Sequence, residues 1–256
     1  MRSWNLFQGN SIPPQRRSFL DEMIALATAD QPDVLCVQEV PASALPRFTV
    51  GDLASRPPFG VTVGRAVTSL HHGLIRGAVA GQGLGIWLAP SARLVHRQTL
   101  VLNSRSYRRE QARALGLAAS ARSTWAKERR IAQVVRLEVA GRPVVVANVH
   151  CTGCGSDTRV PDAELTLAAE FTLSVAKPDD VVVLAGDFNI GPARSQVLSR
   201  LALPECGFSP ARPGIDHVLV RGAAVGHPHA WPEVRRRAPG GGLLSDHAPV
   251  DLEIDL

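Results

Sequence analysis

Polar side chains that can bind a metal ion or carry a proton adjoin apolar runs at six places along the chain. The six are Trp4-Asn5-Leu6, Val37-Gln38-Glu39-Val40, Val146-Ala147-Asn148-Val149-His150, Ala185-Gly186-Asp187-Phe188-Asn189, Gly214-Ile215-Asp216-His217-Val218 and Leu244-Ser245-Asp246-His247-Ala248-Pro249. Such runs are typical of buried strands, so the polar groups are expected at strand ends, partly removed from water. A carboxylate there needs a cation, a hydrogen-bond donor or a proton. Each segment alone is typical of a turn or helix cap, but together they favour one shared site.

The elements that must position these groups follow from the apolar pattern. Strands are expected at Val34 to Val37, Leu84 to Ala89, Ile131 to Val139, Val144 to Val149, Val181 to Ala185, Ile215 to Val220 and Ala248 to Ile254. Helical spacing predicts helices at about Gln15 to Ala29, Pro161 to Val175 and Ala193 to Leu201. The valine runs are apolar on both faces, which indicates strands covered on each side. Many strands and few helices predict two packed sheets with helices outside.

The remaining stretches give no sign of a domain boundary. Asn103 to Lys127 is rich in arginine and alanine and is expected to be an insertion or a long loop bearing a short helix. Glycine and proline predict loops at Ala80 to Gly85 and at Pro239 to Gly242, and neither resembles an interdomain linker. We therefore expect residues 1–256 to form a single domain.

Composition narrows the class of protein. Hydrophobic residues make up 45% and charged residues 20% of the chain, which is typical of a folded globular protein and excludes a disordered one. The net charge is +5, and every basic residue except Lys127 and Lys177 is arginine. Arginine suits phosphate groups, so a polyanionic partner fits this balance, although a GC-rich genome would also enrich arginine.

Other features bear on location and on metal or redox chemistry. No apolar run is long enough to span a bilayer, and the N-terminal residues lack an apolar leader, so we expect a cytoplasmic protein without integral membrane association. Cys151 and Cys154 form a CxxC pair, which could bind zinc or be redox-active but is more typical of an ordinary loop here. The histidines outside the six segments lack metal-ligand spacing and are expected on the surface or in packing; they are His71, His72, His96, His227 and His229.

The ordered set of segments resembles the endonuclease/exonuclease/phosphatase superfamily, which includes deoxyribonucleases, abasic-site endonucleases, sphingomyelinases and inositol polyphosphate phosphatases. The resemblance spans nearly the whole chain and rests on Asn5, Glu39, Asn-Val-His ending at His150, Gly-Asp-Phe-Asn at Asp187 and Asn189, Ile-Asp-His at Asp216, and Ser-Asp-His-Ala-Pro at Asp246 and His247. It implies an α/β fold, a four-layer αββα sandwich of two mixed β-sheets packed face to face with helices outside. The resemblance also implies that the site lies in the cleft at one sheet edge. The number of expected strands agrees independently with the two-sheet fold.

The resemblance also implies roles for these residues. Glu39, Asn5 and Asp246 are the expected ligands of Mg²⁺ or Mn²⁺, since hard oxygen atoms suit these ions. Asp216 is expected to accept a hydrogen bond from one imidazole nitrogen of His247 and so to orient the ring. The general base stays open between His247 and Asp187, with Asn189 hydrogen-bonding the phosphoryl group and holding Asp187 in place.

Further residues are expected to contact the substrate phosphate. His150 resembles the histidine that contacts the scissile phosphate or protonates the leaving oxygen in the deoxyribonuclease and sphingomyelinase branches. Asn148 stands where many abasic-site endonucleases carry tyrosine, which disfavours abasic-site repair; we place Asn148 and Arg130 among the phosphate contacts. Arg129 and Arg130 precede the strand that pairs with the His150 strand, so one of them could reach a phosphate oxygen, and a solvated charge at the strand end is the alternative. The run 235–237 could grip a polyanion or be an exposed loop.

These observations predict a divalent-metal-dependent phosphoesterase. Its expected substrate is a phosphodiester in DNA or RNA, since the chain is basic, and no obligate protein partner is implied. The alternative is a phosphatase or phosphodiesterase acting on a small phosphorylated metabolite or a lipid headgroup, because fold does not fix substrate. A non-catalytic binding protein on the same scaffold is disfavoured by the intact residue set.

Overall fold

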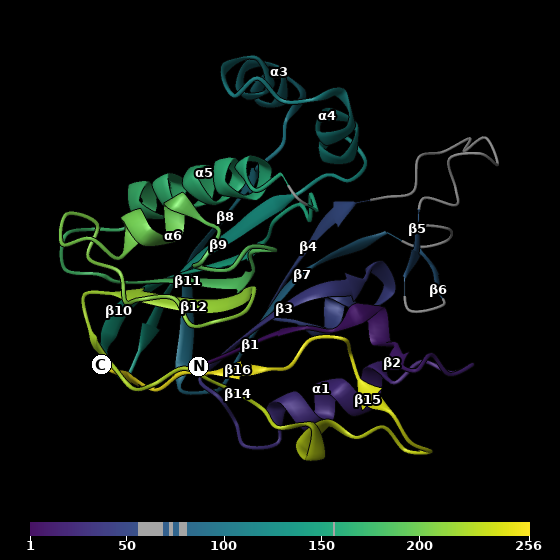
Figure 1. Cartoon of the computed structure of the whole chain (residues 1–256). Helices are drawn as coiled ribbons and strands as arrows, with labels where there is room; N and C mark the ends of the chain where they lie inside the picture. Colours follow the sequence, from purple (N-terminus) through teal and green to yellow (C-terminus); the bar gives the residue numbers. More distant parts are fainter. Residues whose placement is uncertain (56–68, 72–73, 77–80, 156) are drawn as a thin grey trace.

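Two mixed β-sheets lie face to face in the computed structural model, which describes residues 1–55, 69–71, 74–76, 81–155 and 157–256 (Figure 1). The six-stranded sheet has the order β14 (His229–Ala230), β16 (Val250–Asp251), β1 (Arg2–Asn5), β3 (Val34–Pro41), β7 (Gln82–Leu88) and β4 (Val50–Ser55). The five-stranded sheet has the order β12 (Asp216–Arg221), β11 (Val181–Asp187), β10 (Arg142–His150), β9 (Ile131–Val139) and β8 (Ala92–Val101).

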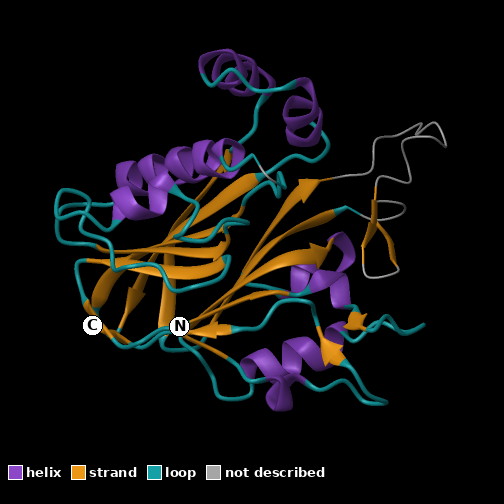
Figure 2. Ribbon diagram, viewed as in Figure 1, coloured by secondary structure: helices purple, strands orange, loops and turns teal. Residues whose placement is uncertain are grey.

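Helices cover the two outer faces, which completes four layers. Figure 2 shows α5 (Arg159–Val175) and α6 (Gln196–Leu201) outside the five-stranded sheet, and α1 (Leu20–Thr28) outside the other sheet. The short 3-10 helix η2 (Ala42–Arg47) also packs on that second outer face. Separate apolar clusters fill the space under α5 and α6, between the two sheets, and under α1. The predicted αββα sandwich is therefore confirmed.

Alternation along the central strands explains how both faces are buried. In β10, Val145, Ala147 and Val149 belong to the cluster beneath α5, whereas Val144 and Val146 belong to the cluster between the sheets. Successive side chains of a strand point to opposite faces, so a strand buried on both sides must be apolar throughout. The same alternation directs Asn148 and His150 into the space between the sheets.

Smaller elements lie at the edges of the sandwich. Three two-stranded pairs join β13 (Ala224–Val225) with β17 (Ile254–Asp255), β15 (Leu243–Leu244) with β2 (Ser11–Ile12), and β5 (Ser69–His71) with β6 (Leu74–Arg76). The 3-10 helices η1 (Phe7–Gly9) and η3 (Glu233–Arg236) follow β1 and precede β15. The helices α3 (Arg105–Ala114) and α4 (Ala119–Trp125) form a hairpin between β8 and β9 that stands away from the sheets in Figure 1. None of the described helices is long and apolar enough to cross a membrane.

Some boundaries differ from those expected. Gln82 to Gly85 belongs to β7 instead of a loop, while Ala80 lies outside the described residues. The glycines there permit close approach, because a Cβ on Gly83 would lie 2.1 Å from the carbonyl oxygen of Asp52. The first helix begins at Leu20 instead of Gln15, since the backbone before it is tied elsewhere and Phe19 N–H donates to the Gly9 carbonyl. The stretch 103–127 carries two short helices instead of one.

Candidate active site

Three side chains from separate segments approach one oxygen of Asp187. Nδ2 of Asn5 donates to Oδ2 of Asp187 at 3.0 Å, and the same oxygen lies 3.5 Å from Nε2 of His150 and 3.7 Å from Nε2 of His247. Nδ2 of Asn5 also lies 3.5 Å from Oε1 of Glu39. Asp187 is only 1% exposed, so these contacts form in a site largely closed to water.

Strand register places three of the predicted residues in a row. His150 pairs with Asp187 across β10 and β11, and Asp187 pairs with Asp216 across β11 and β12. Directly paired residues point to the same face of a sheet, so all three face the gap between the sheets at one edge. His217 follows Asp216 and takes the opposite face, where its ring packs 5.2 Å from that of Phe188.

The backbone around the site is unusually strained. Among the described residues, seven other than glycine have positive φ, a region that is costly for residues with a side chain. Five of the seven adjoin the site: Phe7, Gln8, Glu39, Asn189 and Ser245. Glu39 lies at a register shift between Val37 and Val40, where β3 pairs with β7. This irregularity lets the carboxylate reach Asn5 from the end of a buried strand.

A second carboxylate orients His247. Nδ1 of His247 donates to Asp216 at 2.9 Å, which leaves Nε2 facing Asp187 and Asp246, whose Oδ1 is 3.9 Å away. Burial of the ring lowers the pKa of His247, but the carboxylates of Asp187, Asp216 and Asp246 outweigh it and raise that pKa to about 10. These three carboxylates therefore favour the protonated form of the His247 ring.

The site carries more carboxylates than nearby cations. Burial raises the pKa of Asp187 to about 7, and the Asp216 carboxylate adds to the rise while His247 opposes it. Glu39 and Asp246 add two further carboxylates, and the residue set thus has the hard oxygen donors that suit a divalent cation. Atoms of Asp187, Asp216 and His247 lie within 4.8 Å of one another. We read that trio as a hydrogen-bonded array, because Nδ1 of His247 is already engaged by Asp216.

The amide of Asn5 has an orientation that its neighbours fix. Its Oδ1 accepts from the backbone N–H of Phe7 at 3.0 Å, and its Nδ2 faces Asp187 and Glu39. A backbone N–H can only donate, so the oxygen must face Phe7 and the nitrogen must face the carboxylates. In this arrangement Asn5 holds two carboxylates in place, and its role as a metal ligand stays a prediction.

His150 lies between Asp187 and an arginine. Nη1 of Arg130 approaches Nδ1 of His150 at 3.0 Å, and Nη2 of Arg130 pairs with Glu128 at 2.9 Å. The same Nη1 lies 3.2 Å from Nε2, so one guanidinium nitrogen contacts both ring nitrogens of His150. The structure thus brings Arg130 into the site beside His150, as the sequence suggested.

Asn189 closes the loop that follows Asp187. Its backbone N–H donates to Oδ1 of Asp187 at 2.9 Å, which matches the expectation that Asn189 holds Asp187. Its side-chain Nδ2 donates to the carbonyl of Cys151 at 2.9 Å. The side chain therefore joins the loops after β10 and β11. For Nδ2 to contact a phosphoryl group, the hydrogen bond to Cys151 would have to break.

Asn148 does not belong to the substrate face. It is fully buried between the sheets, where Nδ2 donates to the carbonyls of Val37 and Gly85 and Oδ1 accepts from Gln38. A side chain with no exposure and a complete set of partners cannot contact a substrate. The assignment of Asn148 to the substrate phosphate is therefore not supported, and its amide instead links the two sheets.

Two residues support the site in a way that the sequence did not indicate. Oγ of Ser245 donates to the carbonyl of Asn5 at 2.6 Å and accepts from the N–H of His247 at 3.1 Å. Nη1 of Arg236 donates to the carbonyls of Leu244 and Ser245, and Arg236 is 8% exposed. Arg236 thus supports the loop bearing Asp246 and His247 and is not a surface group for polyanions. Ser245 is part of the motif, whereas no sequence signal distinguished Arg236 from Arg235.

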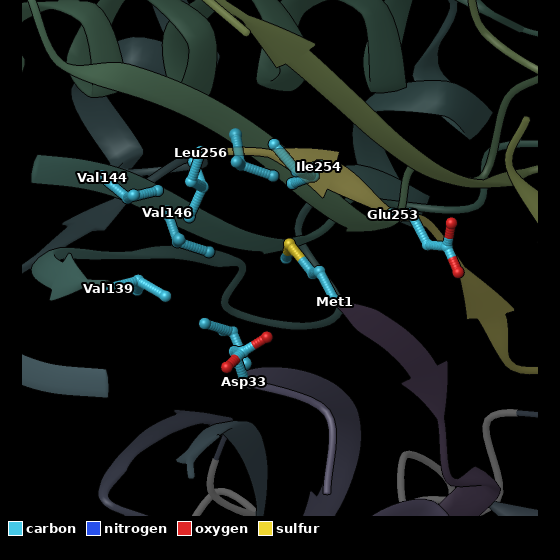
Figure 3. Close-up of a pocket in the computed structure, with 10 residues that line it drawn as sticks. Met1, Asp33, Val139, Val144, Val146, Glu253, Ile254 and Leu256 are labelled. Carbon is cyan, nitrogen blue, oxygen red and sulfur yellow. The ribbon is translucent and has the colours of Figure 1, made fainter. Parts of the chain in front are cut away.

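Other candidates lie away from this chemistry. Cys151 and Cys154 are free thiols; Cys151 is buried, and burial raises its pKa well above the usual value. His72 lies outside the described residues, and His96 is exposed on β8. A cavity of about 200 Å³ opens at the opposite ends of the strands, near Val144, Val146 and Leu256 (Figure 3). His150 and Asp187 lie at the other ends of β10 and β11, so this cavity is separate from the site.

Comparison with known proteins defines the class. A model of the Endonuclease/Exonuclease/phosphatase family matches residues 3–247. An endonuclease/exonuclease/phosphatase from Bacteroides vulgatus has a similar structure, with 16% identity, coverage of 99% of this chain and 98% of that chain, and a TM-score of 0.63. The mannosyl-6-phosphatase of Bacteroides thetaiotaomicron is 13% identical over 100% and 98% of the two chains, with a TM-score of 0.62. D. rerio TDP2 complexed with a single-strand DNA product is 15% identical over 97% and 95%, with a TM-score of 0.59. A search of curated protein sequences finds no match.

The fold and the site define a phosphoesterase of the αββα sandwich type. The chain belongs to the Endonuclease/Exonuclease/phosphatase family, because the match covers almost its whole length. The predicted family, fold and phosphoesterase class are thereby confirmed.

Proposed function

We propose that this chain is a Mg²⁺- or Mn²⁺-dependent phosphodiesterase that hydrolyses nucleic acid. The observation that carries the proposal is the meeting of Asn5, His150 and His247 at one oxygen of Asp187, with Glu39 beside them. Phosphoester hydrolysis requires positioned charge for the phosphoryl oxygens, an activated water and support for the leaving oxygen. These residue types at these distances can meet all three requirements.

Glu39 and Asp246 are the residues that would hold the metal ion, with Asn5 fixing the carboxylate of Glu39. When bound, such an ion neutralises phosphoryl oxygen charge and acidifies water. The chain's own residues then divide the remaining work. Since Asp216 holds Nδ1 of His247 and neighbouring carboxylates favour a proton on the ring, we assign His247 to binding a phosphoryl oxygen as a cation. We assign the proton-accepting role to Asp187. The neighbouring pair of His150 and Arg130 is placed to bind the scissile phosphate or to support the leaving oxygen.

The second candidate keeps this chemistry but changes the substrate to a small phosphorylated metabolite or a lipid headgroup. Its support is the structural likeness to a mannosyl-6-phosphatase, which is as close as the likeness to TDP2. The net positive charge of +5 favours a polymeric anion and places nucleic acid first.

Purified protein with Mg²⁺, Mn²⁺ or EDTA should be tested on plasmid DNA, single-stranded DNA, RNA, sugar phosphates and inositol phosphates. We expect metal-dependent cleavage of a nucleic acid and its loss in Glu39→Gln. The matched control is Glu253→Gln, an exposed glutamate at the opposite end of the strands. Turnover of a small phosphoester with no cleavage of any nucleic acid would select the second candidate. Equal rates with EDTA and with metal would contradict the metal requirement.

Two broader assignments also belong to the proposal. A cytoplasmic location is supported by the four free cysteines, since thiols persist in a reducing compartment. The folding of residues 1–256 as one domain is supported by the apolar cluster shared between the two sheets, which joins strands from both halves of the chain.

A further inference from the structure

The positive charge of this protein is concentrated in one short segment. Residues 103–130 contain eight basic and two acidic side chains, a net charge of +6, whereas the whole chain has a net charge of +5. The other residues therefore sum to −1. The basic character is therefore a property of the α3–α4 hairpin and of residues 126–130, the return segment that leads from α4 to β9. Codon usage alone would have distributed arginine evenly along the chain.

The hairpin is firmly attached beside the loop that follows His150. Leu117, Ala121, Trp125 and Val160 form its own apolar cluster against the start of α5. The hydroxyl of Tyr107 donates to the carbonyl of Ala163 at 2.8 Å. These contacts hold the hairpin against α5, although it projects from the sandwich in Figure 1.

Three arginines form a row on the outer face of α3. Arg105, Arg109 and Arg113 are exposed and follow one another at intervals of four residues, about 6 Å apart along a helix axis. In the part of the chain that the structure describes, none of the three makes an ion pair. Like charges at this spacing destabilise a helix, as does a cation in its first turn, where Arg105 stands without an acidic neighbour. The placement of Arg105 and Arg109 works against the stability of α3, which favours a role in binding, whereas Arg113 stands in the last turn, where a cation is favourable.

A second set of contacts links the hairpin to the catalytic edge. Nδ2 of Asn103 donates to the carbonyls of Trp125 and Glu128, and its Oδ1 accepts from the N–H of Arg130 at 2.9 Å. The side chain of Arg130 in turn contacts His150. One buried asparagine therefore closes the base of the hairpin and fixes the backbone of a site residue.

A groove lies at this base. It has a volume of about 490 Å³ and lies between the end of β4 and the return segment, and the residues that line it are Leu53, Ala54, Ser55, Lys127, Glu128 and Arg129. Lys127 and Arg129 are exposed at its edge, and Glu128 pairs with Arg130 of the site. An extended anionic strand in this groove would meet basic groups on the return segment before it reaches His150.

We propose that the α3–α4 hairpin is an arm that binds the phosphate backbone of a nucleic-acid substrate beside the catalytic site. The inference rests on the proposed function, of which it specifies the substrate class and the residues that engage it. A lipid surface is disfavoured, because none of the exposed large hydrophobic residues in the described chain lies in the hairpin. The row of arginines offers charge without base-reading groups, so binding through it is insensitive to sequence.

The test measures binding in EDTA, so that no turnover occurs. Fluorescence anisotropy with a labelled 30-nucleotide single strand and the corresponding duplex compares wild type with R105Q/R109Q/R113Q across a range of salt concentrations. The matched control is R97Q/R142Q/R221Q, which removes the same charge from exposed arginines on β8, β10 and β12. We expect the hairpin variant to bind about 10- to 100-fold more weakly, with the slope of log K against log salt reduced by about 2, and the control to change little. Equal thermal melting curves show that both variants fold.

Three outcomes would overturn the proposal: unchanged DNA affinity of the hairpin variant, an equal loss in the control variant, or loss only of binding to vesicles containing phosphatidylserine. The proposed function is tested separately, by hydrolysis of bis(p-nitrophenyl) phosphate by wild-type protein with Mn²⁺ or EDTA. Hairpin-dependent DNA binding without that hydrolysis would reject the function and keep the arm. Hydrolysis by wild-type protein, together with unchanged DNA affinity in the hairpin variant, would keep the proposed function and reject the arm.

Discussion

At the residue scale, Asp187 is the centre of the site because its two oxygens have different partners. Oδ1 accepts from the backbone of Asn189, while Oδ2 faces Asn5, His150 and His247. One oxygen therefore fixes the carboxylate, and the other is directed at the reacting groups. Such a division is what a proton-accepting residue requires, since the acceptor must keep its position as its charge changes.

Replacing Asp187 by asparagine keeps the shape of this residue and removes its charge. We expect kcat to fall by roughly 10²- to 10⁴-fold, the range typical of a lost general base, with little change in the thermal midpoint. Steady-state kinetics on the best substrate of the panel measures the loss. Asp33→Asn, at the opposite end of the strands, serves as the control. A variant that turns over within threefold of wild type would remove Asp187 from the mechanism.

Arg236 allows a second prediction, because it supports the catalytic loop without facing the substrate. Arg236→Met leaves the carbonyls of Leu244 and Ser245 without their donor. We expect kcat to fall by about 10- to 100-fold as Asp246 and His247 lose their position, since displacements of about 1 Å have effects of this size. Arg236→Lys should recover part of the rate, because it restores a donor. Equal activity of Arg236→Met and wild type would show that the loop holds its place unaided.

At the element scale, the site depends on the close approach of β10 and β11. Gly186 has φ of 139° and precedes Asp187, and a Cβ there would lie 1.9 Å from the carbonyl oxygen of Val149. No side chain fits at that distance, so the two strands must separate if Gly186 is replaced. The separation would displace both His150 and Asp187, which are register partners.

Gly186→Ala should therefore reduce both stability and turnover. We expect a loss of about 2–4 kcal/mol in the free energy of unfolding, from overpacking and from strain at positive φ, and a reduction in kcat of at least tenfold. Denaturant unfolding and steady-state kinetics measure the two effects. Gly226→Ala, where a Cβ would lie 3.6 Å from Glu253, is the control and should be nearly neutral. Wild-type stability of Gly186→Ala would refute the close packing described for these strands.

At the scale of the whole molecule, a buried arginine joins the two ends of the chain. Arg2 is 2% exposed, and it binds Asp251 on β16, Asp30 after α1 and the carbonyl of Ala27. Its guanidinium also lies 4.2 Å from the ring centre of Trp231. This cluster ties together β1, α1 and β16, so it stabilises the sheet whose edge carries Asn5 and Asp246.

The cluster predicts a specific loss of stability in acid. The hydrogen bond from Arg2 lowers the pKa of Asp30 to about 2. Burial raises the pKa of Asp251, but the hydrogen bonds from Arg2 and Trp231 outweigh burial and lower that pKa. A carboxylate whose pKa is lower in the folded state binds fewer protons there, so its contribution is complete above the unfolded pKa of about 3.9 and is lost as pH falls toward 2. Denaturant unfolding at several pH values should show this decline. Asp30→Asn should make it shallower, whereas exposed Asp179→Asn should not; equal slopes in the two variants would contradict the assignment.

The sequence by itself determined the family, the two-sheet fold and most of the residues at the site. An apolar run that ends in a polar residue is a local signal in the sequence. The order of the six motifs along the chain also does not depend on the conformation of the loops between them. His150 and Asp187 are the last residues of β10 and β11, and Asp216 is the first residue of β12, so all three could be found in this way. Glu39 lies near the end of β3, and His247 lies in the loop between β15 and β16.

Only the tertiary structure decided what depends on contacts between distant segments. Asn148 and His150 share a face of β10, yet the opposing sheet covers the first and leaves the second in the site. Arg236 and Arg235 are neighbours in one basic run, and only the path of the catalytic loop turns Arg236 inward. The direction of the Asn5 amide likewise depends on the turn at Phe7. Composition, spacing and strand alternation carry no information about which partner a side chain meets across the fold, and that partner determines its role.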